Sequence, residues 1–450
     1  MTTFDSAAAT AQWMATLSPE DTARAVSYTQ GGHWLLLWGV LVSIAVAWVI
    51  IRTGWLSAIR DRLERRRPRP KLVSLVVGVV YLLTSFVLTL PWAIYQNWWR
   101  EKAYGLTEQP LTGWLTEALM GTAISTVFGG LLIVALYFLI RRTGRAWWIW
   151  GGGLAGVAVV FMLLVAPIFI EPLFNTYTPA PDGPVRDAVV ELAHKTGTPD
   201  DKIFIYDGSK QSDRYTANVS GLFGSARVAM SDVMFTKGAD LAEVRGVVGH
   251  EMGHYVHMHS LWLTGAMIIL SMVSFFLADR LYPVARRLLG ANRVGDIADP
   301  AGLPVLAAVL AVLGVLATPV TNTLIRTIEE DADHFSLIHA NEPDGLSKAL
   351  IKTAEYRAPS PSAIEEFLFY DHPSVENRVR PLPDEDGAGR IAGTEAADET
   401  RIAGDHVLLP QVEGDDRTGR GGVGVLVEHD DVLLGRRVAA QDLAADELVH

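Results

Sequence analysis

The chain has 450 residues, half of them hydrophobic, with 13 Trp and a positive mean hydropathy of +0.23, a composition that indicates a membrane protein. It contains no Cys, which excludes disulfides, thiolate metal sites and a Cys nucleophile, so any metal must be held by His and carboxylate side chains. Residues 381–450 hold 16 Asp and Glu against 6 Arg and therefore account for most of the net charge of -12; nothing in the rest of the chain resembles the basic surface of a nucleic-acid-binding protein.

Six apolar segments follow an N-terminal segment of residues 1–32, and each is long enough, or nearly so, to cross a bilayer, which takes about 20 helical residues. They lie at residues 33–51, 72–90, 115–140, 147–170, 261–277 and 303–320. For the last two, which are the shortest, a helix buried in a soluble core is the alternative. Trp34 and Trp147, at segment ends, fit an interfacial belt. We therefore predict an α-helical, multi-pass integral membrane protein with four transmembrane helices within 33–170 and a transmembrane hairpin within 261–320.

Arginine gathers in three of the short connections between these segments, at residues 52–71, 141–145 and 280–293. Because the spans alternate in direction, all three connections fall on one side of the membrane. The positive-inside rule assigns that side to the cytoplasm. The stretches after the fourth and sixth spans would then face the opposite side.

The first long stretch between spans, residues 171–260, contains both helix and strand patterns. Hydrophobic periodicity and turn residues predict a helix, a strand, a strand pair and a second helix. These lie over residues 184–196, 202–206, 217–230 and 241–259. The second helix ends just before the fifth apolar segment.

The pentapeptide His250-Glu251-Met252-Gly253-His254 in this helix places two imidazoles four residues apart. Residues i and i+4 share a helix face, so both rings can bind one metal ion while Glu251 acts on a water molecule beside it. The alternative is a His-rich helix face in solvent. His259, close behind the motif, is predicted to be an ordinary polar residue where the helix meets the membrane.

A catalytic zinc site usually has three protein ligands. The last His of a metzincin motif is absent here, because Ser260 occupies its position. Beyond the hairpin, Glu329 is a candidate third ligand, and Asp333, one helical turn later, is a candidate for orienting a ligating imidazole. The alternative is a solvated acidic helix start.

The chain then continues helically to about residue 340 and reaches His372-Pro373. We predict that residues 321–383 form a second part of the domain begun at 171–260. Residues 384–450 are acidic and poor in aromatic side chains, which is typical of a disordered tail.

Taken together, these motifs resemble a known family. The sequence HEMGH, a membrane hairpin, and then the run EEDAD at residues 329–333, which fits the pattern E-x-x-A-D, resemble the type 1 CAAX prenyl proteases, which are integral-membrane zinc metalloproteases. Leu90-Pro91-Trp92, Asn218, and His372-Pro373 followed by Arg378 add to the resemblance, which covers about residues 72–380.

The resemblance implies a zinc metalloendopeptidase of the gluzincin type, with a multi-span helical bundle and a mostly helical protease domain that carries a small β-sheet. One Zn²⁺ per chain would be held by His250, His254 and Glu329, the last selected because Ala332-Asp333 must end the motif. Asp333 would support one of the imidazole ligands.

The expected reaction is hydrolysis of a peptide bond by water that zinc activates. Glu251 would take a proton from this water and pass it to the leaving amine. The resemblance further implies that Asn218 holds the substrate backbone against an edge strand, that His372 stabilises the oxyanion, and that Arg378 belongs to the substrate-binding residues.

Two questions stay open at the level of sequence. Eukaryotic members have seven spans and a cytosolic site, so the family topology and the arginine-rich loops of this chain predict opposite faces for the site. The substrate is a peptide or protein, either prenylated or of the broader class cleaved by a membrane quality-control endopeptidase. A non-catalytic membrane scaffold is the alternative outside the enzymes; a transporter is disfavoured because the spans contain almost no charge.

Overall fold

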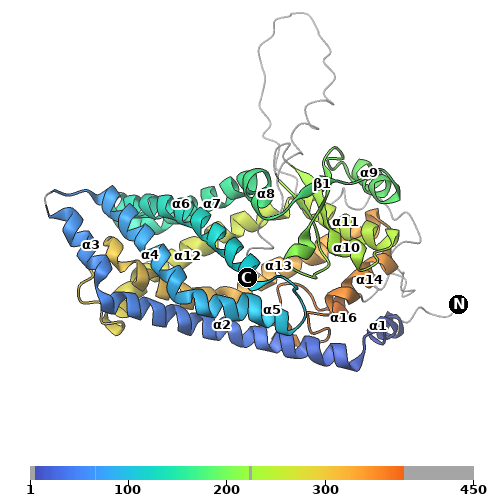
Figure 1. The fold of residues 1–450 in the computed structure, drawn as a ribbon, viewed down its shortest axis with the longest axis horizontal. Helices are drawn as coiled ribbons and strands as arrows, with labels where there is room; N and C mark the ends of the chain where they lie inside the picture. The colour runs from blue at the N-terminus through green and yellow to red at the C-terminus, as the bar shows by residue number, and fades with distance from the viewer. Residues whose placement is uncertain (1–5, 66, 222–225, 380–450) are drawn as a thin grey trace, which may run out of the picture.

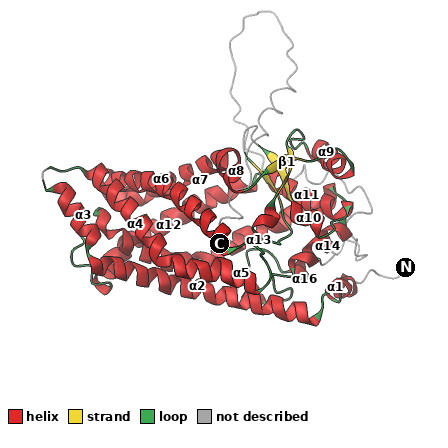
Figure 2. Cartoon of the chain, in the orientation of Figure 1, coloured by secondary structure: helices red, strands yellow, loops and turns green. Residues whose placement is uncertain are grey.

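The computed structural model describes residues 6–65, 67–221 and 226–379, so the predicted tail at 384–450 lies outside the described residues. The molecule is elongated, and its long helices run from one end toward the other (Figure 1). Among the described residues, strands occur only at the end that also holds α9, α10 and α14 (Figure 2). A long-helix bundle joined to a mostly helical unit with a small sheet confirms the predicted fold class.

The helices of the bundle contain five of the six predicted apolar segments in full, and the fourth, 147–170, runs through a helix into the π-helical turn η3 (Ala166–Ile170). These helices are α2 (Pro19–Thr53), α4 (Pro70–Ile94), α6 (Leu111–Thr143), α7 (Trp147–Val165), α12 (His259–Leu288) and α13 (Leu303–His339). Among the described residues, five helical runs are long and apolar enough to cross a membrane. One of them, Leu111–Phe174, holds both α6 and α7. These two helices pack against each other and are joined by the 3-10 turn η2 (Gly144–Ala146). Val87 and Leu316 are 64% and 70% exposed, as apolar side chains that face lipid should be.

Shorter elements join the long helices. They are α1 (Ser6–Met14), α3 (Trp55–Glu64), the π-helical turn η1 (Tyr95–Trp99), α5 (Arg100–Ala103), the π-helical turn η3 (Ala166–Ile170), α8 (Glu171–Phe174) and the 3-10 turn η5 (Pro300–Gly302). The helix α2 begins 14 residues before the predicted first span, because Ser18 caps it by accepting from the Asp21 backbone N–H and Pro19 occupies its first position.

The sheet has four strands in the order β1-β2-β4-β3. They are β1 (Tyr177–Pro179), β2 (Ile203–Tyr206), β3 (Ala217–Ser220) and β4 (Arg227–Ser231). The central pair β2 and β4 is parallel, and the outer pairs are antiparallel. The strand β3 is therefore an edge strand, in which Asn218 lies opposite Ala229. Periodicity did not predict β1, because three residues are too few to show an alternation.

Helix α11 (Leu241–Val256) lies at the centre of the unit that contains the sheet. It packs against α9 (Pro184–Thr196) and α14 (Pro343–Thr353). The other helical elements of this unit are α10 (Asp232–Thr236), the 3-10 turn η4 (Gly208–Lys210), α15 (Ala363–Phe369) and α16 (Val375–Arg378). Val244, Val248 and Met252, spaced four residues apart, bury one face of α11 in the same core as Val228 and Met230 of β4.

An adjacent side of α11 packs closely against α13 through glycines. A Cβ atom added at Gly253 would lie 2.9 Å from the Phe335 Cβ and 3.1 Å from the Ala332 Cα, and one added at Gly249 would lie 2.9 Å from the Ala340 Cβ. Such distances are shorter than real Cβ contacts, so the close approach of the two helices requires glycine at these positions.

The predicted helix over 241–259 is wrong at its end. Helix α11 ends at Val256, and α12 starts at His259 after a single residue in the left-handed region, Met258 with φ 54°. This break turns the chain toward the membrane span. Hydrophobic periodicity could not show it, because one left-handed non-glycine residue leaves no pattern in a sequence.

Candidate metal centre

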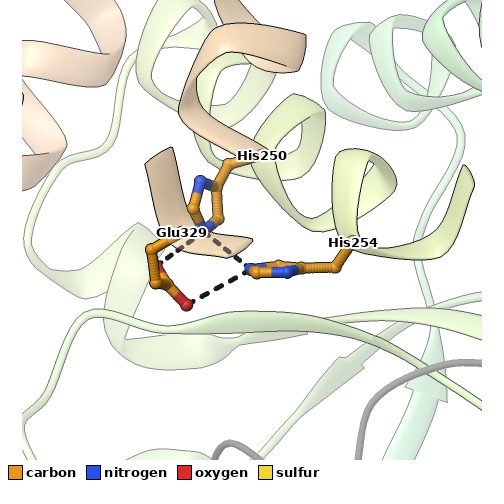
Figure 3. Close-up of side chains that lie close together, drawn as sticks. All are labelled: His250, His254 and Glu329. Atoms are coloured by element: carbon orange, nitrogen blue, oxygen red, sulfur yellow. Dashed lines mark hydrogen bonds and ion pairs between the residues drawn. The ribbon is translucent and has the colours of Figure 1, made fainter. Parts of the chain in front are cut away.

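Two helices bring three potential metal ligands together (Figure 3). His250 and His254 lie one turn apart on α11, and Glu329 lies on α13. The two Nε2 atoms are 3.1 Å apart. Glu329 places Oε2 3.3 Å from Nε2 of His250 and Oε1 3.4 Å from Nε2 of His254. All three side chains are buried.

These distances fit a metal ion between the three side chains. In a tetrahedral site with metal-ligand bonds of about 2.0–2.1 Å, the ligand atoms lie about 3.3–3.4 Å from one another. In addition, Oε2 of Glu329 is buried and lies 3.3 Å from Nε2 of His250 and 3.6 Å from Nη2 of Arg378; a cation bound between the ligands would neutralise this buried carboxylate further. The donor set and its spacing therefore fit a divalent cation.

The first imidazole is oriented by a carboxylate on α13. Nδ1 of His250 lies 2.8 Å from Oδ1 of Asp333, and Arg378 donates to both oxygens of Asp333, from Nε and Nη2, at 2.7 Å each. An Nδ1–H donated to Asp333 leaves the Nε2 lone pair for a metal. Burial alone lowers the pKa of His250, but the hydrogen bonds and charges of Asp333 and Glu329 raise it to about 10.

The second imidazole is oriented by another histidine. Nδ1 of His254 lies 2.9 Å from Nδ1 of His259, and Nε2 of His259 lies 3.0 Å from Oδ2 of Asp331. If Nε2 of His254 faces a metal, its Nδ1–H donates to His259, whose own Nε2–H then donates to Asp331. The sequence treated His259 as an ordinary polar residue, and missed this role because the left-handed turn at Met258 decides where the ring lies.

His372 approaches the same carboxylate from the loop between α15 and α16. Its Nε2 lies 3.3 Å from Oε1 of Glu329, and its Nδ1 lies 2.9 Å from Oδ1 of Asp371. Burial raises the pKa of Asp371, but the charge and hydrogen bond of His372 more than offset this and hold it below its usual range. The structure thus places the predicted His372 beside the candidate ligands.

Glu251 and Arg378 also belong to this region. Glu251 lies between the two histidines on α11 and is partly buried. Burial lowers the pKa of Arg378, but the negative charges of Asp333, Glu329 and Glu251 raise it overall. The Arg378 side chain is only 8% exposed and is occupied with Asp333, so its predicted contact with substrate stays a prediction.

Asn218 lies on the edge strand β3, which packs against α11. Its Oδ1 atom is buried and accepts no hydrogen bond from the described residues. An edge strand has unpaired backbone groups that can pair with an extended chain.

Two sequence families match consecutive parts of the chain. One, described as the CAAX prenyl protease N-terminal region with five membrane helices, matches residues 6–176, and the other, peptidase family M48, matches residues 179–386. Together they cover both the helical bundle and the candidate metal centre.

Similar proteins point to the same class. The metalloprotease YhfN of Bacillus subtilis is 26% identical over 83% of this chain and 88% of its own length. A CAAX prenyl protease 1 homolog of Arabidopsis thaliana is 27% identical over 70% of this chain and 74% of its own length. The crystal structure of S. mikatae Ste24p shares the fold, with a TM-score of 0.66 and 22% identity over 81% of this chain and 89% of that one.

The matched families, the apolar helical runs and the His-His-Glu group agree with one another. They confirm the predicted multi-pass membrane protein and the predicted hydrolysis of peptide bonds. The chain is a membrane-integral metalloendopeptidase that is similar to CAAX prenyl protease 1 and whose residues 179–386 match peptidase family M48.

Proposed function

We propose that the metal of this centre is one Zn²⁺ ion and that His250, His254 and Glu329 hold it. Two imidazole nitrogens and one glutamate oxygen form the ligand set of thermolysin-type zinc peptidases. The observation that carries the proposal is the spacing of the ligand atoms: the two Nε2 atoms are 3.1 Å apart, and the carboxylate oxygens of Glu329 lie 3.3 and 3.4 Å from them. When bound, zinc supplies a Lewis acid that polarises the scissile carbonyl and lowers the pKa of a water molecule.

Glu251 acts as general base and then general acid. Its position beside both ligating histidines on α11 supports this role. The carboxylate takes a proton from the attacking water and later gives it to the leaving amine. Arg378 is close enough to influence Glu251 electrostatically, and it holds Asp333 in place beneath His250.

His372 stabilises the negative charge that develops on the carbonyl oxygen. Donation from Nε2 while Nδ1 donates to Asp371 requires the imidazolium form of His372. The Asp371 carboxylate, 2.9 Å from the ring, is the counter-charge for that form. A donor placed in advance at this position stabilises the transition state more than the ground state.

The substrate binds as an extended chain along β3. Its backbone groups pair with the edge of that strand, and Asn218 offers to a substrate N–H a buried amide oxygen that accepts no hydrogen bond from the residues that the structure describes. Residues 171–260 and 321–383 thereby form one protease domain, with the membrane hairpin of residues 261–320 between its two parts.

We assign the substrate to peptides held at the membrane surface, because both ligand-bearing helices lead directly into apolar spans. A prenylated C-terminus is the finer possibility suggested by the name of the plant relative. Hydrolysis of one peptide with and without a farnesyl group separates this class from a general quality-control endopeptidase. Faster cleavage of the farnesylated form supports the prenyl substrate, and equal cleavage supports the broader role.

The central test uses purified protein in detergent, with zinc content measured by mass spectrometry and hydrolysis by a fluorogenic peptide. We expect Glu251→Gln to keep the zinc of this centre and lose activity by at least about 1,000-fold, and Glu329→Ala to lose the zinc of this centre. The neighbouring Glu330→Ala, at an exposed position of α13, is the matched control and should keep both the zinc and the peptidase activity. Hydrolysis retained by Glu251→Gln would refute its role, and zinc without cleavage in the wild type would favour a scaffold.

A further inference from the structure

A second group of metal-binding side chains lies beside the proposed centre. His257 and His259 flank the left-handed Met258 between α11 and α12, and Asp331 faces them from α13. One potential ligand atom from each of the three residues lies within 4.8 Å of the others. None of the three is a ligand of the His250-His254-Glu329 centre.

The contacts within this group converge on one carboxylate oxygen. Oδ2 of Asp331 contacts Nδ1 of His257 directly and lies 3.0 Å from Nε2 of His259. The side chains of His257 and Asp331 are 40% and 46% exposed, whereas that of His259 is 7% exposed. An ion could therefore reach the group from solvent and complete its coordination with water, while the buried His259 links it to the interior.

Two imidazole nitrogens and one carboxylate oxygen suit a borderline divalent cation such as Zn²⁺. The same ligand types form the proposed catalytic centre, so both groups would compete for the same metal. They differ in burial, because the ligands of the catalytic centre are all buried and two of the three residues here are partly exposed.

We propose that His257, His259 and Asp331 form a second Zn²⁺ site, and that its occupation weakens metal binding by His254 in the catalytic centre.

The coupling follows from the hydrogen bond between His254 and His259. When His254 binds metal through Nε2, its Nδ1 carries the proton and needs the lone pair on Nδ1 of His259, 2.9 Å away. When His259 binds metal through Nε2, its own proton must lie on Nδ1. Two N–H groups then face each other, so one ring must rotate or His254 loses the hydrogen bond that orients it. Loss of such an orienting bond typically weakens metal affinity by about 10- to 100-fold.

This coupling rests on the proposed role of His254, but the second site itself does not. The second site and the catalytic centre can be tested separately with Zn²⁺ alone, by measuring bound zinc per chain in equilibrium dialysis against rising free zinc. We expect two zinc ions in the wild type, one in Glu329→Ala, one in His257→Gln, and none in the double variant. His334→Gln, at an exposed position of α13 near Asp331, is the matched control and should keep two.

Activity supplies the second measurement. With both sites filled, His254 lacks its orienting hydrogen bond while it holds the catalytic zinc, so excess zinc should lower wild-type hydrolysis by about 10-fold or more. His257→Gln should stay within about twofold of its own activity at one equivalent of zinc. A single zinc in the wild type, or identical zinc content in Glu329→Ala and the double variant, overturns the second site. If the wild type binds two zinc ions but excess zinc inhibits the wild type and His257→Gln equally, the coupling between the two sites is overturned. If Glu329→Ala alone keeps full zinc and activity, the proposed catalytic site fails instead.

Discussion

At the scale of single residues, the two imidazoles of the proposed zinc site are held by different kinds of acceptor. Asp333 contacts Nδ1 of His250 directly, with its charge shared by Arg378, whereas the neutral ring of His259 stands between His254 and Asp331. A carboxylate beside a ligating ring makes it both a stronger metal ligand and a stronger base. Protons should therefore compete with the metal mainly for the ring nitrogen of His250.

The raised pKa of His250 leads to a pH prediction. In the metal-free protein its pKa is about 10, so at neutral pH the ring carries a proton that metal binding must expel. Zinc affinity should therefore rise by about tenfold per pH unit between pH 6 and 8 for this one proton. Competition with a chromophoric chelator at several pH values measures the slope. An affinity independent of pH over this range would contradict the protonation state inferred for His250.

Arg378 should be sensitive to a conservative change. Its Nε and Nη2 atoms donate to the two oxygens of Asp333, and a lysine ammonium cannot reproduce this paired geometry. We expect Arg378→Lys to weaken zinc binding by about 10-fold or more. Arg186→Lys, at a partly exposed position of α9, is the control. If Arg378→Lys raises the KM for peptide without changing zinc affinity, the residue contacts substrate, as the sequence predicted.

At the scale of elements, the site depends on how closely α11 approaches α13. The glycines that allow this approach lie on the face of α11 that carries the ligands toward Glu329. Gly253→Ala would force the helices apart, at a cost of about 1–3 kcal/mol for overpacking, and should lower zinc content together with thermal stability. Gly265→Ala on α12, where a Cβ meets nothing within 4 Å, should change neither. Full zinc content in Gly253→Ala would show that the ligands tolerate a wider spacing.

Sequence patterns predicted the elements whose signal is repeated over many residues. The long apolar helices, α9 and the helix carrying His250 and His254 follow from periodicity and ligand spacing, and Glu329 follows from the E-x-x-A-D pattern. The strand β1 and the helices α15 and α16 are too short to show a pattern. Helix α14 was missed although Leu346, Ala349 and Leu350 recur at helical spacing on its buried face. The partnership of His254 with His259 could not be predicted, because it depends on the backbone conformation of Met258 alone.

At the scale of the whole molecule, the arginine-rich loops gather at the end opposite the sheet (Figure 1). Arg60 donates to the Arg293 backbone oxygen at 3.1 Å, and Arg141 donates to that of Ala298 at 3.4 Å. The three loops therefore lie together, and the positive-inside rule predicts that this end faces the cytoplasm and that the proposed zinc site faces the other side.

Single cysteines can test this orientation, because the natural chain contains none to give background. We expect Asp182→Cys, whose native side chain is 97% exposed near the sheet, to react with an impermeant maleimide in intact cells. Asn292→Cys, at an exposed position of the arginine-rich end, should react only after permeabilisation. The reverse pattern would give the site the cytosolic orientation that the family resemblance implies.

Helix α13 runs without a break from its apolar segment to Glu329. The apolar segment ends near Val320, nine residues before Glu329, which is about 13 Å along a helix axis. An extended peptide covers that distance in about four residues. The helix therefore fixes the distance between the metal and the bilayer. A substrate anchored in the lipid would present to the metal a bond about four residues from its anchor. The cleavage site would then be selected by its distance from the membrane as well as by side-chain identity.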